Sequence, residues 1–500
     1  MRKKIILLPL DERPCNYVFP QELLRDNPEY SLAVPGRELM GNKKTPGDPE
    51  KLARFLSEQA KDADIAVVSI DTLVYGGLLS GRLHHETAEE LGERLDVLGE
   101  IKRANPRIKI YAFSLIMRCP RYSSSDEEPD YYASVGKEIF LLGEVEHRKS
   151  LGLDYDGQVY ADCKRKCAPY IDDYLTRRAV NVEINLRVVD LVGGAIDYLI
   201  IPQDDSSVYG FMAMDQQKVR AYVAENNKQN LVSIYPGADE VALTLLARAV
   251  QNDKGVRLGV NTFFASEHGK FVVPLYEDRM LAESVKCQIR AAGCVESLDR
   301  GDFILAVNAP ASDMREANEQ FGKVCAAYSV NRSLCEFVDR IEYETGRGSA
   351  VAVADVAYGN GGDVTLAAML DRAGVAGKIA AYAGWNTSGN TLGTCISAAV
   401  FSVLFGRGTV DEFIALRFFE DVGFCSHARW AVAAKLSAMG LDYYDLKDKN
   451  TAISAEVARE TAEFTKKIMP GFADGYEIID CAMPWNRMFE TRLVVRKKAR

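Results

Sequence analysis

Short apolar runs rich in β-branched residues alternate with longer helix-forming segments along most of this chain. Several runs are apolar almost throughout, which is typical of parallel strands covered on both faces by helices. Such an alternation builds βαβ units, so an α/β fold with a parallel sheet is expected. The runs that predict strands are Lys4–Pro9, Ile65–Ile70, Ile108–Leu115, Tyr198–Pro202, Leu231–Tyr235, Arg257–Phe264, Phe303–Val307, Ala350–Ala354 and Ile379–Ala383.

Helical segments fill the intervals between these runs, and two of them begin with clear start signals. Thr87 and Glu90 have the spacing of a capping box, and Asp48-Pro49 supplies an N-cap followed by proline at the first helical position. We therefore predict helices over 48–60, 87–104, 170–193, 215–226, 239–252 and 278–292.

The number of strands is compatible with two architectures. Nine strands fit a (β/α)₈-barrel-like parallel sheet with one extra strand, and they also fit two smaller doubly wound lobes. We expect the barrel-like catalytic domain over residues 1–405. From residue 406 the pattern becomes mainly helical, so residues 406–500 are predicted to form an α-rich C-terminal region.

Composition narrows the class of partner. Hydrophobic residues make up 47% of the 500 residues, and no apolar run approaches the roughly 20 residues that span a bilayer. A net charge of −10 disfavours nucleic acid and anionic membrane surfaces as partners. Eleven cysteines, an odd number without a secretion signal, favour reduced thiols in the cytoplasm. The composition is compatible with self-association into a homo-oligomer.

Acidic and amide residues recur directly after the predicted strands. Ligands of parallel α/β folds bind at the carboxyl ends of the strands, so these side chains are expected on one rim. The adjacent pair Asp204 and Asp205 is the sharpest feature, because two neighbouring carboxyls at a buried strand end cannot both ionise freely. One of them then serves as a general acid and the other as a base or stabilising group. The alternative is that one caps the next helix and the other faces solvent.

A second part of the rim is suited to sugar binding. Trp385 and Asn386, in a glycine-rich loop, offer an aromatic platform beside an amide, although tryptophan also commonly serves as core. The residues predicted to bind substrate are Asp11, Arg13, Asp71, Tyr75, Arg118, Trp385, Asn386 and Asn390. The polar loop over 121–132 is either a functional lid or a plain connector.

The sequence lacks the motifs that mark several enzyme classes. The glycine-rich stretch 358–362 has neither of the nucleotide-binding patterns, and the chain has no G-x-S-x-G elbow. Five histidines are few for a histidine-based or zinc mechanism, so carboxylate chemistry without a cofactor is expected. A divalent cation held by carboxylates is the alternative, and its candidate ligands are Asp11, Asp71, Asp355 and Asp363.

Seven short strings carry a resemblance to a known family. They are Pro9–Pro14, Asp71–Gly77, Gln203–Asp205, Gly237–Glu240, Ala354–Asp355, Asn360–Asp363 and Trp385–Asn390. Over residues 1 to about 430 the chain resembles the bacterial domain-of-unknown-function family 4127, a likeness that implies no established activity.

The site alone is weakly similar to substrate-assisted β-N-acetylglucosaminidases on (β/α)₈ barrels, which carry an aspartate pair after the fourth strand and a later Trp-Asn loop. That likeness implies that Asp204 orients the substrate acetamido group and that Asp205 protonates the leaving oxygen. The chain departs from those enzymes in its extra acidic strand ends and in the insertion before the pair.

We therefore expect a cytoplasmic hydrolase of a glycoside, with N-acetylhexosaminides as one candidate class, or of a related polyhydroxylated small molecule. Asp204 and Asp205 are the expected catalytic pair. The alternatives are a divalent-metal-dependent hydrolase and a non-catalytic sugar-binding protein.

Overall fold

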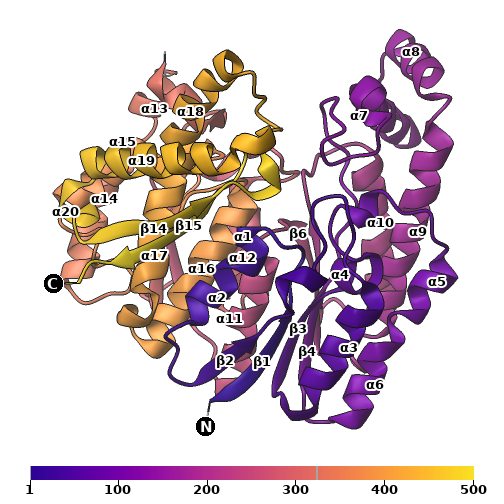
Figure 1. Ribbon diagram of the computed structural model, residues 1–500, viewed down its shortest axis with the longest axis horizontal. Coiled ribbons are helices and arrows are strands. Elements are labelled where there is room, and N and C mark those ends of the chain that lie inside the picture. The colour runs from indigo at the N-terminus through magenta and orange to yellow at the C-terminus, as the bar shows by residue number, and fades with distance from the viewer. Residues whose placement is uncertain (1, 323–324, 500) are drawn as a thin grey trace. The chain divides into compact units, whose positions relative to one another are not determined.

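A computed structural model describes residues 2–322 and 325–499 (Figure 1). The chain forms two compact units. Unit 1 consists of Met1–Glu12, Glu29–Leu245 and Tyr276–Asp278, and unit 2 of Arg13–Pro28, Leu246–Leu275 and Arg279–Arg500. Residue 405, where the sequence suggests a domain boundary, lies inside unit 2.

Unit 1 is built on a six-stranded parallel sheet with the order β2-β1-β3-β4-β5-β6. Its strands are β1 (Lys3–Leu8), β2 (Tyr30–Ala33), β3 (Ile65–Ser69), β4 (Lys109–Phe113), β5 (Tyr198–Gln203) and β6 (Val232–Pro236). The predicted strands of this unit are all present, and β3, β5 and β6 are buried along their whole length, as parallel strands covered on both faces should be.

Unit 2 contains a separate parallel sheet with the order β13-β11-β9-β7-β8. Its strands are β7 (Gly259–Phe264), β8 (Val295–Glu296), β9 (Phe303–Asn308), β11 (Val351–Asp355) and β13 (Ala381–Ala383). Two small pairs accompany it: parallel β10 (Arg315–Glu316) with β12 (Tyr358–Gly359), and antiparallel β14 (Tyr476–Ala482) with β15 (Arg492–Lys497).

The α/β class and the parallel sheets are therefore confirmed, but the expectation of one (β/α)₈ barrel is not. The sheets stay open. In unit 1 the short strand β2 pairs with β1 on the side opposite β3, which is the side that a closing strand would occupy in a barrel. The alternative of two smaller lobes describes the chain better, because each unit has its own open parallel sheet.

Helices of unit 1 follow the predicted pattern closely. The capping box of Thr87 and Glu90 is present, and Asp48 accepts hydrogen bonds from the first turn of its helix. The helices are α3 (Pro49–Gln59), α4 (Ile70–Tyr75), α5 (Ala88–Glu93), α6 (Asp96–Ala104), α7 (Tyr132–Ser150), α8 (Gly157–Cys167), α9 (Ile171–Asp190) and α10 (Phe211–Glu225). Helix α11 (Val241–Lys254) begins in unit 1 and ends in unit 2.

Unit 2 begins with two short helices from the N-terminal part of the chain, drawn in indigo in Figure 1. Its helices are α1 (Pro14–Tyr17), α2 (Phe19–Leu24), α12 (Leu281–Ala291), α13 (Ala327–Val330), α14 (Leu334–Gly346), α15 (Val364–Arg372), α16 (Ser388–Phe405), α17 (Asp411–Arg417), α18 (Arg429–Leu436), α19 (Asn450–Ile468) and α20 (Pro470–Ala473). A π-helical segment, Phe418–Ala428, joins α17 to α18. The C-terminal region thus contains the β14–β15 hairpin in addition to its helices.

Helix α16 is long and apolar enough to cross a membrane, but 83% of it is buried within the fold. A central helix of a soluble protein has this character. The eleven cysteines are all free thiols. Cys163 and Cys167 are buried on α8 and pack in an apolar cluster with Tyr132 and Ile139 of α7, which gives that close cysteine pair a structural role.

Candidate functional site

The strand ends of unit 1 are tied together by hydrogen bonds. Ser69, the last residue of β3, caps α4 by accepting from the backbone of Thr72, so Asp71 lies in the first helical turn. The Thr72 hydroxyl lies 2.7 Å from the carbonyl oxygens of Pro9 and Leu10, which follow β1. The Asp71 carboxylate accepts from the Leu115 amide beyond β4 at 3.0 Å. These bonds fix the carboxyl ends of three neighbouring strands in one rigid rim.

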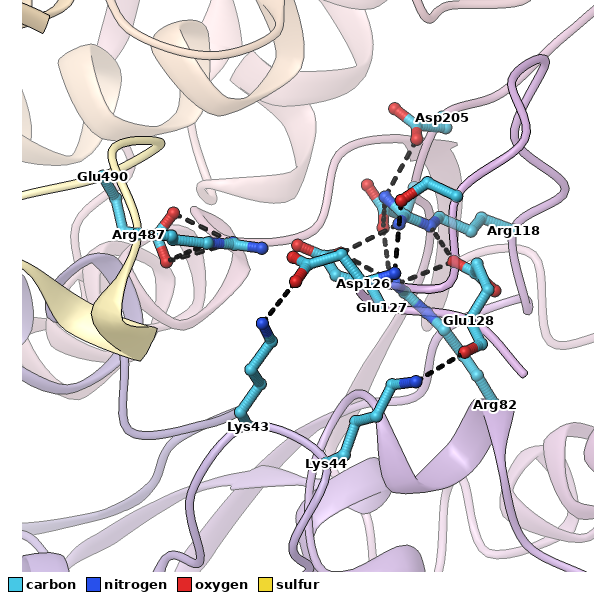
Figure 2. Close-up of polar contacts among 12 residues, drawn as sticks. Lys43, Lys44, Arg82, Arg118, Asp126, Glu127, Glu128, Asp205, Arg487 and Glu490 are labelled. Carbon is cyan, nitrogen blue, oxygen red and sulfur yellow. Dashed lines mark hydrogen bonds and ion pairs between the residues drawn. The ribbon is translucent and has the colours of Figure 1, made fainter. Parts of the chain in front are cut away.

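Two buried arginines organise the carboxylates of this rim (Figure 2). Arg118, after β4, donates to Glu128 at 2.7 Å, to Glu127 at 2.8 Å and to Asp205 at 3.0 Å. Arg82, in the 3-10 turn Ser80–Arg82, donates to Asp204 at 2.7 Å, and its other terminal nitrogen lies within 3.2 Å of Glu127 and Glu128. We call this set of two arginines and four carboxyl groups the carboxylate cluster.

The two aspartates of the pair differ in their surroundings. Asp204 forms ion pairs with both Arg82 and Arg118, at 2.7 and 3.7 Å. Asp205 pairs with Arg118. Burial and the charge of Asp204 raise the pKa of Asp205 to about 7, although both arginines act in the opposite direction. Asp205 also has a φ of 46°, in the left-handed region that favours glycine, so the surrounding contacts hold its backbone in a strained conformation.

Asp71 lines a small cavity together with members of the carboxylate cluster. Burial raises the pKa of Asp71 to about 7, while the Leu115 amide and the charge of Arg82 act in the opposite direction. This cavity of about 10 Å³, lined among others by Asp71, Arg82, Arg118 and Asp204, has room for about one water molecule. The buried Oε2 of Glu128 has no hydrogen-bond partner within the described part of the chain, so the cluster keeps spare acceptor capacity.

The remaining predicted substrate-binding residues of unit 1 are buried close to the strand ends. Asp11 is 3% exposed, in the loop after β1. Tyr75, at the end of α4, stacks on His84 with ring centroids 4.9 Å apart, and burial raises its pKa. The structure thus places Asp11, Asp71, Tyr75 and Arg118 in the same unit as the aspartate pair.

The other predicted substrate-binding residues belong to unit 2. The Trp385 ring packs edge-on against Phe19, with centroids 5.5 Å apart, and its indole nitrogen donates to Thr394. These are contacts typical of a core tryptophan. Asn386 accepts from the backbone of Asn360 through its carbonyl, and Asn390 is buried in the first turn of α16. The guanidinium of Arg13 lies 4.9 Å from the ring centre of Trp485.

The candidate metal ligands Asp355 and Asp363 form a closed network in unit 2. Asp363 caps α15, and its other oxygen accepts from Arg332 at 2.6 Å. Asp355 accepts from the Asp363 amide, from Tyr382 and from Asn308. Burial and the charge of Asp363 raise the pKa of Asp355 to about 7.

Every carboxylate oxygen of Asp355 and Asp363 therefore has an internal donor, and the other two candidate ligands, Asp11 and Asp71, lie in unit 1. Among residues 2–322 and 325–499, no group of three or more His, Cys, Asp or Glu side chains is arranged to hold a metal ion.

Comparison with known families identifies the family of this chain. Residues 5–494 match a family described as a protein of unknown function (DUF4127). The chain belongs to the DUF4127 family. The match extends the resemblance seen in the sequence, which ended near residue 430, through almost the whole chain.

Two further comparisons set this DUF4127 chain against curated proteins and against solved structures. A search of curated proteins gives no match. Among solved structures, the carboxyl transferase domain of Rhizobium etli pyruvate carboxylase with 3-bromopyruvate aligns at a TM-score of 0.21 and 11% identity. That alignment covers 95% of this chain and 59% of the other, and a score this low supports no argument about fold or activity.

Sequence reasoning missed three members of the carboxylate cluster in this DUF4127 chain: Arg82, Glu127 and Glu128. Arg82 follows α4 in a 3-10 turn and has no strand-end signal. Glu127 and Glu128 come from the polar loop over 121–132, and the acidic run Asp126-Glu127-Glu128 is the signal that could have identified them. The loop therefore supplies side chains to the cluster.

Proposed function

We propose that this chain is a cytoplasmic hydrolase of a glycoside or a related polyhydroxylated small molecule, with Asp205 as general acid and Asp204 as its carboxylate partner. The observation that carries this proposal is the unequal environment of two adjacent carboxyl groups. Asp204 pairs with two guanidinium groups, whereas burial and its neighbour raise the pKa of Asp205 to about 7. Environments that separate two titratable neighbours in this way supply an acid and a base to one site.

The protonation state of Asp205 suits the first step of glycoside cleavage. A carboxyl group with a pKa near 7 holds its proton on about half of the molecules at neutral pH, and it can pass that proton to a leaving oxygen. Asp204 then faces the positive charge that develops on the sugar ring, or orients an acetamido group where the substrate carries one. The proton given up by Asp205 is recovered from the water that completes hydrolysis.

The remainder of the cluster supports binding of a hydroxyl-rich molecule. Glu127 is an acceptor held in place by Arg82 and Arg118, and its side chain is 16% exposed, whereas Glu128 is fully buried as a structural partner of both arginines. Hydroxyl groups donate to carboxylates in charge-assisted hydrogen bonds, which are stronger than neutral ones. A small polyol or sugar supplies several such donors.

The test is a screen of 4-nitrophenyl glycosides, N-acetylglucosaminides first, followed by two variants of the active preparation. Because 4-nitrophenolate leaves with little protonation, the variants are compared on the matching alkyl glycoside. On that substrate Asp205→Asn is expected to lower kcat by at least about 100-fold, the usual contribution of a general acid, with substrate binding retained. Asp130→Asn, at an exposed aspartate of the neighbouring loop, is the matched control and should keep full activity. An Asp205→Asn variant as active as the control would refute the assignment, and saturable sugar binding without turnover would favour the sugar-binding alternative.

A further inference from the structure

A second cavity of unit 1 lies among α7, α8, α9 and α10. Its volume of about 460 Å³ is within the range of small-molecule sites. Leu142, Ile171, Leu175, Phe211 and Met214 supply most of its apolar wall. Leu175 is 38% exposed, so this wall is open to solvent at the α9 side. The function proposed above makes no use of this cavity.

The charged groups around the cavity carry an excess of positive charge. Asp215 accepts two hydrogen bonds from Arg178, at 2.9 and 2.7 Å, and pairs with Lys218 at 3.3 Å, so two cations face one carboxylate. Glu146 accepts from the Tyr160 hydroxyl at 2.8 Å. Lys164 lies 5.7 Å from the Tyr160 ring centre and has no carboxylate partner within the described part of the chain.

We propose that this cavity binds a small amphipathic anion, a carboxylate on an aliphatic or aromatic body. The apolar wall receives the body of the ligand, and the exposed ammonium group of Lys164 at the α8 side receives the carboxylate. Lys218 and Arg178 add to the positive potential although both are engaged with Asp215. A cationic ligand of the same shape meets three cations and two carboxylates at this cavity, and it is disfavoured.

The cavity is linked to the carboxylate cluster through one side chain. Arg178, which lines the cavity, also donates to the backbone carbonyl of Arg118 at 3.0 Å, and the Tyr174 hydroxyl donates to the same carbonyl at 3.2 Å. A ligand that moves or immobilises Arg178 therefore acts on the segment that carries Arg118. This regulatory consequence rests on the proposed function, whereas the binding itself does not.

Binding is tested on the full chain with 8-anilinonaphthalene-1-sulfonate as fluorescent probe and decanoate as competitor. We expect one saturable site from which decanoate, but not decyltrimethylammonium, displaces the dye. Lys164→Glu should weaken decanoate binding at least about tenfold. Ala179→Trp should abolish it, because Ala179 is an exposed position of α9 that lines the cavity and a tryptophan there would fill it. Lys137→Glu, at an exposed lysine of α7 that does not line the cavity, is the charge-matched control and should bind within twofold of the parent.

Equal displacement by both detergents, or unchanged binding in Lys164→Glu and Ala179→Trp, would overturn the proposal. Hydrogen exchange supplies the second readout: decanoate should slow exchange in residues 115–120, and unchanged exchange there would refute the link to Arg118. If the chain binds decanoate but hydrolyses no glycoside, the proposed anion site is supported and only the proposed hydrolase activity is refuted.

Discussion

The guanidinium group of Arg118 donates from Nε to Oε1 of Glu128 across 2.7 Å, and Glu128 is fully buried. Removing one partner of a buried ion pair leaves the other charge without compensation, which typically costs about 3–5 kcal/mol. We expect Glu128→Ala to lower the free energy of unfolding by about 3 kcal/mol in urea titrations. Asp130→Ala, in the exposed part of the same loop, should change it by less than about 0.5 kcal/mol. Equal stability of the two variants would contradict the role of Glu128.

The pH dependence of turnover reports the protonation of Asp205. Because the pKa of Asp205 is raised to about 7, kcat/KM should fall about tenfold per pH unit above that value, as the general acid loses its proton. The charge of Arg82 lowers this pKa, so Arg82→Gln should move the falling limb to higher pH. Lys137→Gln, on α7, should leave the limb in place. A limb that moves to lower pH in Arg82→Gln would show that another group carries the proton.

Asp71 should make the stability of the chain depend on pH. Its pKa is about 7 in the folded state and near 3.8 when unfolded, so the folded chain holds one more proton between these values. Stability therefore falls as pH rises from 4 to 7. Asp71→Asn has no such proton to lose. As pH rises from 4 to 7, the free energy of unfolding of this variant should therefore increase relative to that of the parent by at most about 4 kcal/mol.

Urea titrations of the Asp71→Asn variant at pH 4, 5, 6, 7 and 8 measure this difference. Asp96→Asn, at an exposed position of α6, is the control and should follow the parent at every pH. A constant offset between Asp71→Asn and the parent, without dependence on pH, would contradict the buried proton.

Asp363 should behave as a structural residue. Its side chain caps α15 and pairs with Arg332 at 2.6 Å. Asp363→Ala loses both interactions and should destabilise the chain by about 3–5 kcal/mol, whereas Asp363→Asn keeps the cap and should lose less. Thermal denaturation should also give the same Tm with excess Mg²⁺ and with a chelator. A Tm that rises with Mg²⁺ in the parent and not in Asp363→Asn would instead support the metal-dependent alternative.

Trp385 offers a direct comparison between a core role and a substrate-binding role. It is 7% exposed, and it contacts Phe19 and Thr394. Trp385→Phe should lower the free energy of unfolding by about 1–2 kcal/mol through lost packing and one lost hydrogen bond, with KM unchanged. An increase in KM at unchanged stability would instead show that Trp385 contacts the substrate, as the sequence suggested.

The sequence predicted the strands well because parallel strands are apolar runs that stand out from their surroundings. It did not predict β2, β8 or the strands of the two small pairs β10–β12 and β14–β15. Of these, β2 has the sequence Tyr30-Ser-Leu-Ala33, which is no such run. That strand forms through its pairing with β1, where Lys3 faces Tyr30. A tertiary pairing of this kind leaves little trace in local composition, and it is the pairing that leaves the sheet open where a barrel was expected.

The candidate site was predictable in part for the same reason. Asp204, Asp205, Asp71 and Arg118 all follow apolar runs, so topology alone placed them at strand ends. Arg82 comes from a turn and Glu128 from a loop, and their meeting depends on how those segments fold over the rim. Charge balance around a predicted carboxylate pair is a useful hint, since buried carboxylates need guanidinium or ammonium partners that the strand ends alone do not supply.

The chain passes between its two units five times, after Glu12, Pro28, Leu245, Leu275 and Asp278. Unit 1 therefore depends on a returning segment: Gln216 donates to Asp278 at 2.7 Å, and Ser206 donates to the carbonyl of Tyr276. A fragment that ends at Leu245 would contain all six strands of the first sheet and still lack these partners. Neither unit is one continuous stretch of sequence, so no single cut of the chain yields both units intact.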